Sequence, residues 1–212
     1  MMPYLQKYKV VDTNWKIKPW VKIDLDKLKL WYADLENQYG DWKFSYGKHK
    51  HMWKRDPGDS TGVNGHTFQS DTSWYTLCHN SNITGPLPPE RSMSLPEYQD
   101  IDDHNLNPRA CFNGYGLDIV KNLPVRSKRI VVSITTPGTK LALHQDQPDK
   151  IRFHVTIKTN NKFKWVIDGE DIDIPEDGWI YLVNTSLPHY IHNTGDTDRI
   201  SMYGKVWTNE VL

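Results

Sequence analysis

Residues 150–207 read KIRFHVTIKTNNKFKWVIDGEDIDIPEDGWIYLVNTSLPHYIHNTGDTDRISMYGKVW, and their pattern is the clearest indication of the fold class. Apolar and polar residues alternate over short runs, and dipeptides such as Asp168-Gly169 and Asp177-Gly178 separate the runs. Alternation of this kind is typical of strands with one buried face, and Gly-containing dipeptides between them indicate tight turns. The stretch therefore predicts a series of short antiparallel strands.

The same pattern begins near residue 125, so that about eight short strands fill the C-terminal part of the chain. The expected strands are Arg129–Thr136, Leu141–Asp146, Arg152–Lys158, Lys162–Asp168, Glu170–Pro175, Trp179–Asn184, His189–His192 and Arg199–Trp207. Short antiparallel strands in this number are typical of a jelly roll or a related β-sandwich. The predicted fold class is mainly β, a double-stranded β-helix (jelly-roll) core with an N-terminal α/loop elaboration.

Residues 1–125 have a different character, rich in Asn, Gly, Pro and aromatic residues and with few periodic runs. Apolar residues at helical spacing predict a helix over about 24–39. Shorter helices are expected after the capping-box pattern Ser94–Glu97 and over Gly116–Leu123. We expect residues 1–125 to pack on the β core, residues 126–212, and to close its open end. Their loops at 54–66 and 79–90 are the expected substrate-facing segments.

The composition limits the classes of partner. Lys plus Arg and Asp plus Glu both number 26, so the formal net charge is zero. A chain with no net charge lacks the excess of positive charge that is typical of proteins that bind nucleic acid or an anionic membrane. We therefore expect a small-molecule or peptide substrate. No apolar run has the length of a signal peptide or a membrane span, which predicts a cytoplasmic protein. Cys78 and Cys111 are expected as reduced thiols, with one disulfide as the alternative.

His144, Asp146 and His189 are the candidate metal ligands. In a strand, residues two apart point to the same side, so His144 and Asp146 can face one ion. The second and seventh strands of a jelly roll lie close in space, so His189 can complete the set. Two imidazoles and one carboxylate hold non-haem Fe(II) and leave positions open for a co-substrate and O₂. A lone His-x-Asp is common by chance, and His192 competes as the third ligand, but its odd spacing from His189 puts it on the opposite strand face.

Arg199 follows His189 at the start of the last expected strand and is the candidate for holding 2-oxoglutarate. A guanidinium binds a carboxylate through two parallel hydrogen bonds. We expect this strand to lie beside the seventh in a hairpin-like arrangement. The alternative is a surface arginine paired with Asp196 or Asp198. Three further residues at inward strand positions could donate hydrogen bonds to the co-substrate: Ser133, Arg152 and His154. As isolated polar residues, these three would more often be exposed.

The residues from Ser133 to Gly204 resemble the aspartyl/asparaginyl β-hydroxylase family of 2-oxoglutarate oxygenases. The resemblance runs through three segments: VVSITTPGTKLALHQD, KIRFHVTIKT and GWIYLVNTSLPHYIHNTGDTDRISMYG. The family's serine, Pro-Gly-Thr turn and first metal histidine look like Ser133, Pro137–Thr139 and His144. Its Arg-x-His co-substrate element looks like Arg152-Phe153-His154, and its distal histidine with a later arginine looks like His189 and Arg199. The animal peptide-modifying branch often lacks a carboxylate ligand, so Asp146 is more similar to bacterial free-amino-acid hydroxylases.

The resemblance implies an Fe(II)- and 2-oxoglutarate-dependent dioxygenase that uses O₂ to hydroxylate an unactivated C–H of an amino acid, a peptidyl side chain or a similar small substrate. No catalytic residue beyond the metal ligands is needed, because the iron performs the chemistry. Two alternatives use the same barrel: a cupin-type metal-binding isomerase or sugar-binding protein, and a non-catalytic binding module. Arg199 argues against the first and the intact triad against the second. Nucleic-acid dealkylation is disfavoured by the neutral charge and the single downstream arginine.

Overall fold

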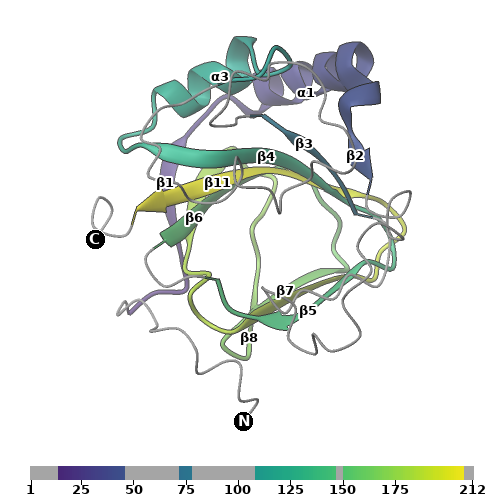
Figure 1. Cartoon of the computed structure of the whole chain (residues 1–212). Coiled ribbons are helices and arrows are strands. Elements are labelled where there is room, and N and C mark those ends of the chain that lie inside the picture. Colours follow the sequence, from purple (N-terminus) through teal and green to yellow (C-terminus); the bar gives the residue numbers. More distant parts are fainter. Residues whose placement is uncertain (1–13, 46–71, 78–107, 147–149, 208–212) are drawn as a thin grey trace, which may run out of the picture.

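The computed structural model describes residues 14–45, 72–77, 108–146 and 150–207 (Figure 1). Its C-terminal strands are β4 (Ser127–Thr135), β5 (Lys140–His144), β6 (Lys150–Lys158), β7 (Phe163–Ile167), β8 (Glu170–Ile172), β9 (Trp179–Val183), β10 (His189–Asn193) and β11 (Arg199–Trp207). Before them come β1 (Ile17–Lys22), α1 (Leu25–Tyr39), the 3-10 turn η2 (Gly40–Trp42), β2 (Phe44–Ser45), β3 (Thr72–Thr76) and α3 (Gly114–Lys121).

The strands form two antiparallel sheets. The large sheet has seven strands in the order β1-β9-β6-β11-β4-β3-β2, and the small sheet has four in the order β5-β10-β7-β8. The two sheets face each other, and α1 and α3 cover the far side of the large sheet (Figure 1). Each strand expected after residue 125 is present as one of β4 to β11, which confirms the mainly β, double-stranded β-helix fold class.

The N-terminal part contributes strands that the sequence analysis did not predict. β1 pairs with β9 at one side of the large sheet, and β3 pairs with β4 toward the other. The register of β1 shifts between Pro19 and Val21. Proline cannot donate a hydrogen bond to a neighbouring strand, so it occurs mainly at sheet edges and at bulges. Strand β1 is an edge strand and has a bulge. The proline made this segment look irregular, so the expectation of few regular elements before residue 125 was wrong here.

Helix α1 agrees with the expected helix over 24–39. Asp24 caps its start, since its side chain accepts a hydrogen bond from the backbone N–H of Lys27 at 3.1 Å. This contact satisfies one of the unpaired amides of the first turn. Leu28, Trp31 and Leu35 share one helix face and are buried. Helix α3 begins two residues before the expected Gly116–Leu123, at Gly114.

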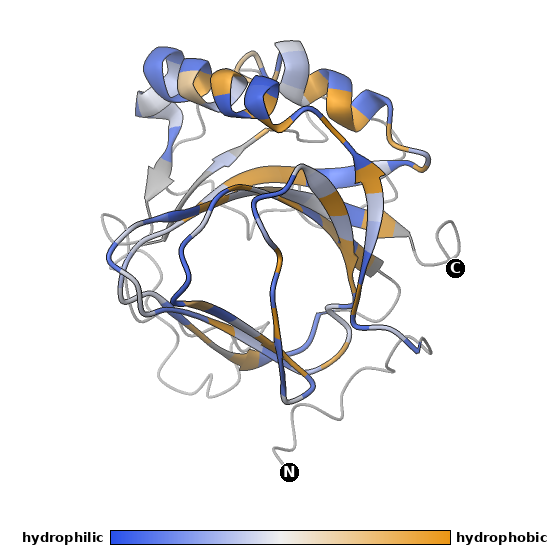
Figure 2. Ribbon diagram, turned by 180° about the vertical axis from the view of Figure 1, so that it is seen from behind, coloured by the Kyte–Doolittle hydropathy of each residue, from blue (hydrophilic) through white to orange (hydrophobic). Residues whose placement is uncertain are grey.

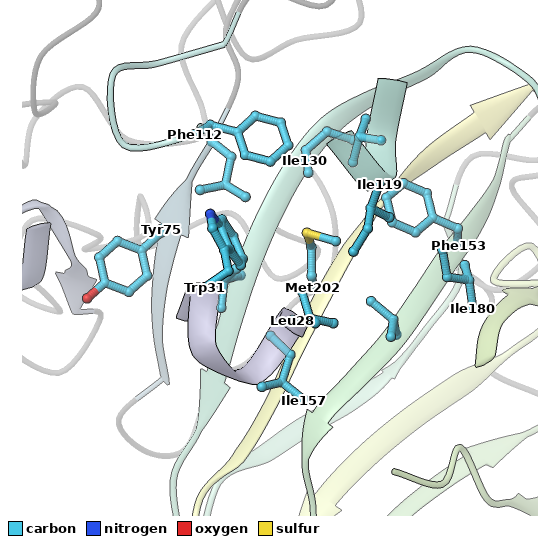
Figure 3. Close-up of a cluster of buried hydrophobic side chains, with 14 of the residues drawn as sticks. Leu28, Trp31, Tyr75, Phe112, Ile119, Ile130, Phe153, Ile157, Ile180 and Met202 are labelled. Atoms are coloured by element: carbon cyan, nitrogen blue, oxygen red, sulfur yellow. The ribbon is translucent and has the colours of Figure 1, made fainter. Parts of the chain in front are cut away.

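The two helices pack on the apolar outer face of the large sheet (Figure 3). Hydrophilic and hydrophobic positions alternate around both helices (Figure 2). Trp31 of α1 meets Phe112 edge to face, with ring centroids 6.2 Å apart. It also lies against Gly116 of α3 so closely that a Cβ atom there would come within 2.4 Å of the indole. The helices and the sheet therefore share one hydrophobic core.

Glu36 links α1 to the large sheet through a polar cluster beside this core. Its carboxylate accepts hydrogen bonds from the hydroxyls of Tyr75 on β3, at 2.7 Å, and of Tyr32, at 3.0 Å. The ammonium of Lys43 also donates to it. Burial, followed by the hydrogen bond to Glu36, raises the pKa of Tyr75 far above its ordinary value. The tyrosines therefore stay protonated and donate to the carboxylate at neutral pH.

The two faces of the large sheet differ in chemistry, and this difference creates the site. Side chains of successive strand residues point to opposite faces. On β4, β6 and β11 the outward residues are apolar and belong to the core under the helices: Ile130, Val132, Ile134, Ile151, Phe153, Val155, Ile157, Ile200, Met202 and Val206. The residues between them point toward the small sheet, and most are polar or charged: Ser133, Thr135, Arg152, His154, Thr156, Arg199, Ser201, Tyr203 and Lys205. A polar interior of this kind is suited to a ligand.

Several further expectations can be compared with the described residues. Cys111 is a free thiol that is 2% exposed, in agreement with the expectation of a reduced cysteine. Cys78, the capping-box pattern Ser94–Glu97 and the loops 54–66 and 79–90 lie outside the described residues. Neither α1 nor α3 has the length and apolar character needed to cross a bilayer.

Candidate metal centre

His144 and His189 come together because β5 and β10 are neighbours in the small sheet. His144 is the last residue of β5 and His189 is the first residue of β10, and the two are direct partners in the antiparallel ladder. Their ring centroids lie 4.2 Å apart, and each side chain is 3% exposed. The expected closeness of the second and seventh barrel strands is confirmed, as direct pairing.

Asp146 joins this pair from just beyond the end of β5. Its backbone N–H donates to the carbonyl of Thr185 at 2.9 Å, which holds the segment near the start of β10. Possible donor atoms of His144, Asp146 and His189 all lie within 4.8 Å of one another. The structure thus brings together the three side chains that the sequence singled out. The strand ends earlier than expected, at His144, but the two side chains still converge.

The protonation states of this triad fit a divalent metal. Burial, followed by the repulsion of His144, lowers the pKa of His189 to about 3. Burial alone would raise the pKa of Asp146, but Arg152, then His189 and Lys205, hold it well below its ordinary value. His189 Nδ1 lies 2.8 Å from the carbonyl oxygen of Leu187, which leaves Nε2 for an ion. A neutral imidazole and an ionised carboxylate are the forms that bind metal, and this donor set suits Fe(II).

His192, the competing third ligand, lies apart from the triad. It is on β10 three residues after His189, and its ladder partners are Lys140 and Lys164. Its side chain is half-buried, whereas that of His189 is buried. Within the described ranges, the group of possible metal donors is His144, Asp146 and His189 without His192.

Arg199 is buried inside the barrel, at 4% exposure, and is not a surface residue. Its guanidinium donates through Nη1 to Ser201 Oγ at 3.0 Å and through Nη2 to Thr156 Oγ1 at 3.2 Å. The rings of Phe163 and Trp165 on β7 lie against it, with centroids 4.4 and 5.8 Å from Cζ. Burial lowers its pKa to about 10, and Asp173 opposes this effect. The alternative of a surface pair with Asp196 or Asp198 is therefore wrong.

The position of Arg199 in the barrel also corrects one expectation. β11 does not lie beside β10 in a hairpin, because β11 pairs with β4 and β6 in the large sheet and β10 belongs to the small one. The connection crosses from one sheet to the other. Arg199 consequently faces the triad from the opposite wall of the barrel.

Ser133 and His154 both lie on this inner wall. Ser133 is the ladder partner of Ser201, the residue that accepts from Arg199. His154 is stacked on Tyr203, with centroids 4.9 Å apart, and meets the edge of Trp165 at 4.6 Å. Neither ring nitrogen of His154 has a hydrogen-bond partner among the described residues. Burial, then the charges of Arg199 and Arg152, lower its pKa well below the ordinary value.

Arg152 has a different environment from the one expected for a co-substrate residue. Its Nε lies 2.6 Å from Asp146 Oδ2, and the two side chains are 21% and 9% exposed. The Arg152 guanidinium also lies 5.1 Å from the ring centroid of Tyr203. The structure thus pairs Arg152 with a candidate metal ligand, whereas its direct role toward 2-oxoglutarate stays a prediction.

Four residues that complete the environment of Arg199 were not predicted from the sequence. Thr156 and Ser201 hold its guanidinium, and Phe163 and Trp165 flank it. A signal for the first two was available, because Thr156 is two residues after His154 and Ser201 is two after Arg199. Residues at this spacing on a strand share a face. For the aromatic pair, only the packing of the two sheets shows what the rings touch.

The chain matches a known protein family over half of its length. Residues 102–209 match the family model described as aspartyl/asparaginyl beta-hydroxylase. The chain belongs to this family. The match begins well before Ser133, the start of the resemblance seen in the sequence, and it includes α3. The protein is accordingly a 2-oxoglutarate-dependent hydroxylase, whose cofactors are Fe(II), 2-oxoglutarate and O₂.

The chain is also similar in structure to several solved proteins. HygX from Streptomyces hygroscopicus, with nickel and 2-oxoglutarate bound, has a TM-score of 0.45 and 12% identity over 91% of this chain and 82% of its own. A prolyl-4-hydroxylase from Pseudomonas putida has a TM-score of 0.40 and 11% identity over 92% and 93%. A predicted oxalate decarboxylase from Thermotoga maritima has a TM-score of 0.37 and 12% identity over 70% and 87%. No curated protein matches the chain in sequence.

Proposed function

We propose that this β-hydroxylase family member hydroxylates an unactivated C–H bond of an amino acid, a peptidyl side chain or a similar small substrate. In this reaction, one oxygen atom of O₂ enters the C–H bond to give C–OH. The other oxygen enters 2-oxoglutarate, which loses CO₂ and becomes succinate. The observation that carries the proposal is the buried triad of two histidines and one aspartate across the barrel from a buried arginine.

His144, Asp146 and His189 would hold the iron. When bound, Fe(II) supplies the redox chemistry that activates O₂, and three protein ligands leave positions open for O₂ and 2-oxoglutarate. The protein orients the three ligand side chains and keeps them in the protonation states that bind a metal. The contact between His189 Nδ1 and the carbonyl of Leu187 fixes the orientation of that ring. The carboxylate of Asp146 offsets part of the charge of the ion.

Arg199 would bind the distal carboxylate of 2-oxoglutarate. No carboxylate among the described residues lies within ion-pair distance of its guanidinium, so the buried charge is suited to an anionic ligand. Thr156 and Ser201 hold the guanidinium in place, and the rings of Phe163 and Trp165 shield it from water. Ser133, beside Ser201, and His154, with unpaired ring nitrogens, are the proposed supporting contacts.

The test is turnover with a substrate panel. The purified chain is supplied with Fe(II), 2-oxoglutarate and ¹⁸O₂, and free amino acids and short peptides are analysed by mass spectrometry. We expect at least one substrate to gain a single labelled oxygen atom, in step with succinate. His189→Ala should abolish both products, and His192→Ala, on the other face of β10, should retain them.

Two results would contradict the proposal. If the metal-loaded protein converts a substrate to an isomer without 2-oxoglutarate, it acts as a cupin-type isomerase. If it binds the metal but forms neither succinate nor a hydroxylated product from any panel member, the proposed substrate classes are wrong.

A further inference from the structure

The pairing of β6 with β11 gives the order of the polar side chains along the inner wall of the barrel. β11 lies in the middle of the large sheet, between β4 and β6 (Figure 1). From one end to the other, the wall presents Arg199, then Ser201 opposite Thr156, then Tyr203 opposite His154, and last Lys205 opposite Arg152. Arg199 and Lys205 are thus at opposite ends, with about 20 Å between their Cα atoms at about 3.3 Å per residue.

The triad lies at the Lys205 end of this wall. Arg152, the direct ladder partner of Lys205, has its Nε 2.6 Å from Oδ2 of Asp146. Directly opposed residues project from the same face, so the side chain of Lys205 also points into the barrel. Burial would raise the pKa of the triad carboxyl, but Arg152, then His189 and Lys205, keep it well below its ordinary value. The ammonium of Lys205 is therefore within electrostatic reach of the metal ligands.

The co-substrate uses the other end of the wall. Its distal carboxylate is assigned above to Arg199, with Ser133 and His154 as supporting contacts, and Lys205 lies beyond these residues. A C–H bond that is to be hydroxylated must lie next to the iron, and the co-substrate fills the Arg199 end of the barrel. The substrate therefore reaches the triad from the end of the wall that Lys205 occupies.

The charges of the wall fit an anionic substrate. Strands β4, β6 and β11 contain no Asp or Glu, and their buried or half-buried inward side chains include three cations: Arg152, Arg199 and Lys205. Lys205 is 7% exposed, and a lysine is rarely buried to this degree without an anion nearby. Fe(II) and the 2-oxoglutarate dianion have equal and opposite charges, so together they leave the balance unchanged. Asp146 offsets only one of the three cations, so a further anion near the iron is favourable.

We propose that Lys205 recognises the substrate, by binding a carboxylate that the substrate carries close to the C–H bond to be hydroxylated. The inference rests on the proposed function, and it narrows the substrate class to acids. An ammonium and a carboxylate in a buried site form a short, charge-assisted hydrogen bond. The group is the α-carboxylate of a free amino acid or the side-chain carboxylate of an acidic residue. A neutral carboxamide in its place would leave the buried ammonium without a charged partner.

The first test compares acids with their amides. The panel contains free amino acids beside the corresponding α-carboxamides, and blocked peptides with Asp or Glu beside the same peptides with Asn or Gln. With Fe(II), 2-oxoglutarate and ¹⁸O₂, we expect the hydroxylated members to be acids. The kcat/KM for the matching amide should be lower by about tenfold or more. The first set isolates an α-carboxylate, and the second set isolates a side-chain carboxylate.

The second test removes the charge of Lys205. Lys205→Met keeps the length and the apolar part of the side chain. For the acid that the wild type uses, kcat/KM should fall by about tenfold or more, mainly through KM, and the preference over the amide should largely disappear. Calorimetry without O₂, on protein loaded with Mn²⁺ and 2-oxoglutarate, should show a similar loss of affinity for the same acid. Mn²⁺ and 2-oxoglutarate themselves should bind no more weakly than to the wild type, because Lys205 is assigned to neither.

Two variants serve as controls. Lys205→Arg keeps a positive charge at this position and should restore part of the preference for the acid. Lys158→Met removes an exposed lysine of β6, opposite Ile200 at the other end of the wall, and should leave both kcat/KM values unchanged. If circular dichroism shows Lys205→Met to be unfolded, Lys205→Gln carries the same comparison.

The inference is wrong if acid and amide are hydroxylated alike, or if Lys205→Met lowers kcat/KM for both by the same factor. It is also wrong if Lys205→Met binds and hydroxylates the acid as the wild type does, and the proposed function then stands without it. If no panel member gains labelled oxygen while the protein binds Mn²⁺ and 2-oxoglutarate, the proposed substrate classes fail and the inference fails with them.

Discussion

His144 and His189 are direct partners across the β5–β10 ladder, with ring centroids 4.2 Å apart. In an antiparallel ladder, the side chains of directly opposed residues project from the same face. Two imidazoles from distant parts of the chain therefore present their nitrogens to one place. Asp146 follows two residues after His144 and adds its carboxylate there. This relationship places the candidate metal centre on the small sheet, across from Arg199 on the large one.

Replacing His189 by Ala should abolish tight metal binding, because it removes one of three protein donors. The loss in Mn²⁺ affinity should exceed the about 10- to 100-fold cost typical of losing a residue that only orients a ligand. Calorimetry or electron paramagnetic resonance measures it. His192→Ala is the control on the other face of the same strand and should bind Mn²⁺ as wild type does. Comparable losses in the two variants would mean that the third ligand is wrongly assigned.

Replacing Arg199 by Ala should lower the affinity for 2-oxoglutarate at least tenfold. Leaving a buried carboxylate without its charged partner costs on the order of 2–5 kcal/mol. Calorimetry with Mn²⁺ in place of iron gives the affinity without turnover. Ser133→Ala, at the neighbouring ladder position, should have a smaller effect, because it removes one neutral hydroxyl. An unchanged affinity in Arg199→Ala would show that another group holds the carboxylate.

The metal-free protein should lose stability as the pH falls below about 6.5, and His154 should contribute to this loss. Burial, then Arg199 and Arg152, hold the pKa of His154 well below 6.5 in the folded state. The unfolded chain takes up a proton near pH 6.5 that the folded state does not. The free energy of unfolding therefore falls with falling pH, by up to about 1.4 kcal/mol per pH unit for this group.

Urea unfolding at pH 7.5 and pH 5.5 measures this dependence. His154→Phe keeps an aromatic ring beside Tyr203 but cannot titrate, so its free energy of unfolding should change less between the two pH values. Equal changes in the variant and the wild type would show that His154 is protonated alike in the folded and unfolded states.

Gly116→Ala should destabilise the protein by about 1–3 kcal/mol, which is typical of an overpacked core. The added methyl group would lie 2.4 Å from ring atoms of Trp31, so α1 and α3 would have to move apart. Thermal or urea unfolding measures the change. Gly40→Ala is the matched control, because no atom lies within 4 Å of its added methyl group. A neutral Gly116→Ala would mean that the helix interface is looser than the structure indicates.

A fragment comprising residues 126–212 should not fold cooperatively. It would lack β1 and β3, which pair with β9 and β4, and both helices that cover the outer face of the large sheet. The exposed apolar face would favour aggregation. Circular dichroism and urea unfolding of the fragment, beside the full chain, test this expectation. The division at residue 125 stays a prediction, and a fragment that folds and turns over substrate at the full-length rate would contradict the integral role of the N-terminal part.

The type and order of most helices and strands could be predicted from the sequence, because these depend on local pattern. Alternation and turn dipeptides predicted β4 to β11, and helical spacing predicted α1. The same alternation put His144 and Asp146 on one side and excluded His192 from the face of His189. Local pattern did not predict a strand where a single residue is atypical of strands. Strand β1 was not predicted because it contains Pro19. The strand tolerates this proline because β1 lies at the edge of the sheet and has a bulge there.

Which side chains meet in the site depends on the three-dimensional packing of the strands. Periodicity tells which face of a strand a residue occupies, but not which strand lies alongside or opposite. The place of Arg199 across the barrel from the triad depends on β11 joining the large sheet between β4 and β6. The pairing of Arg152 with Asp146 depends on the same long-range contacts. Such contacts form between segments distant in the chain, and burial gives them their strength, so no local signal in the sequence reveals them.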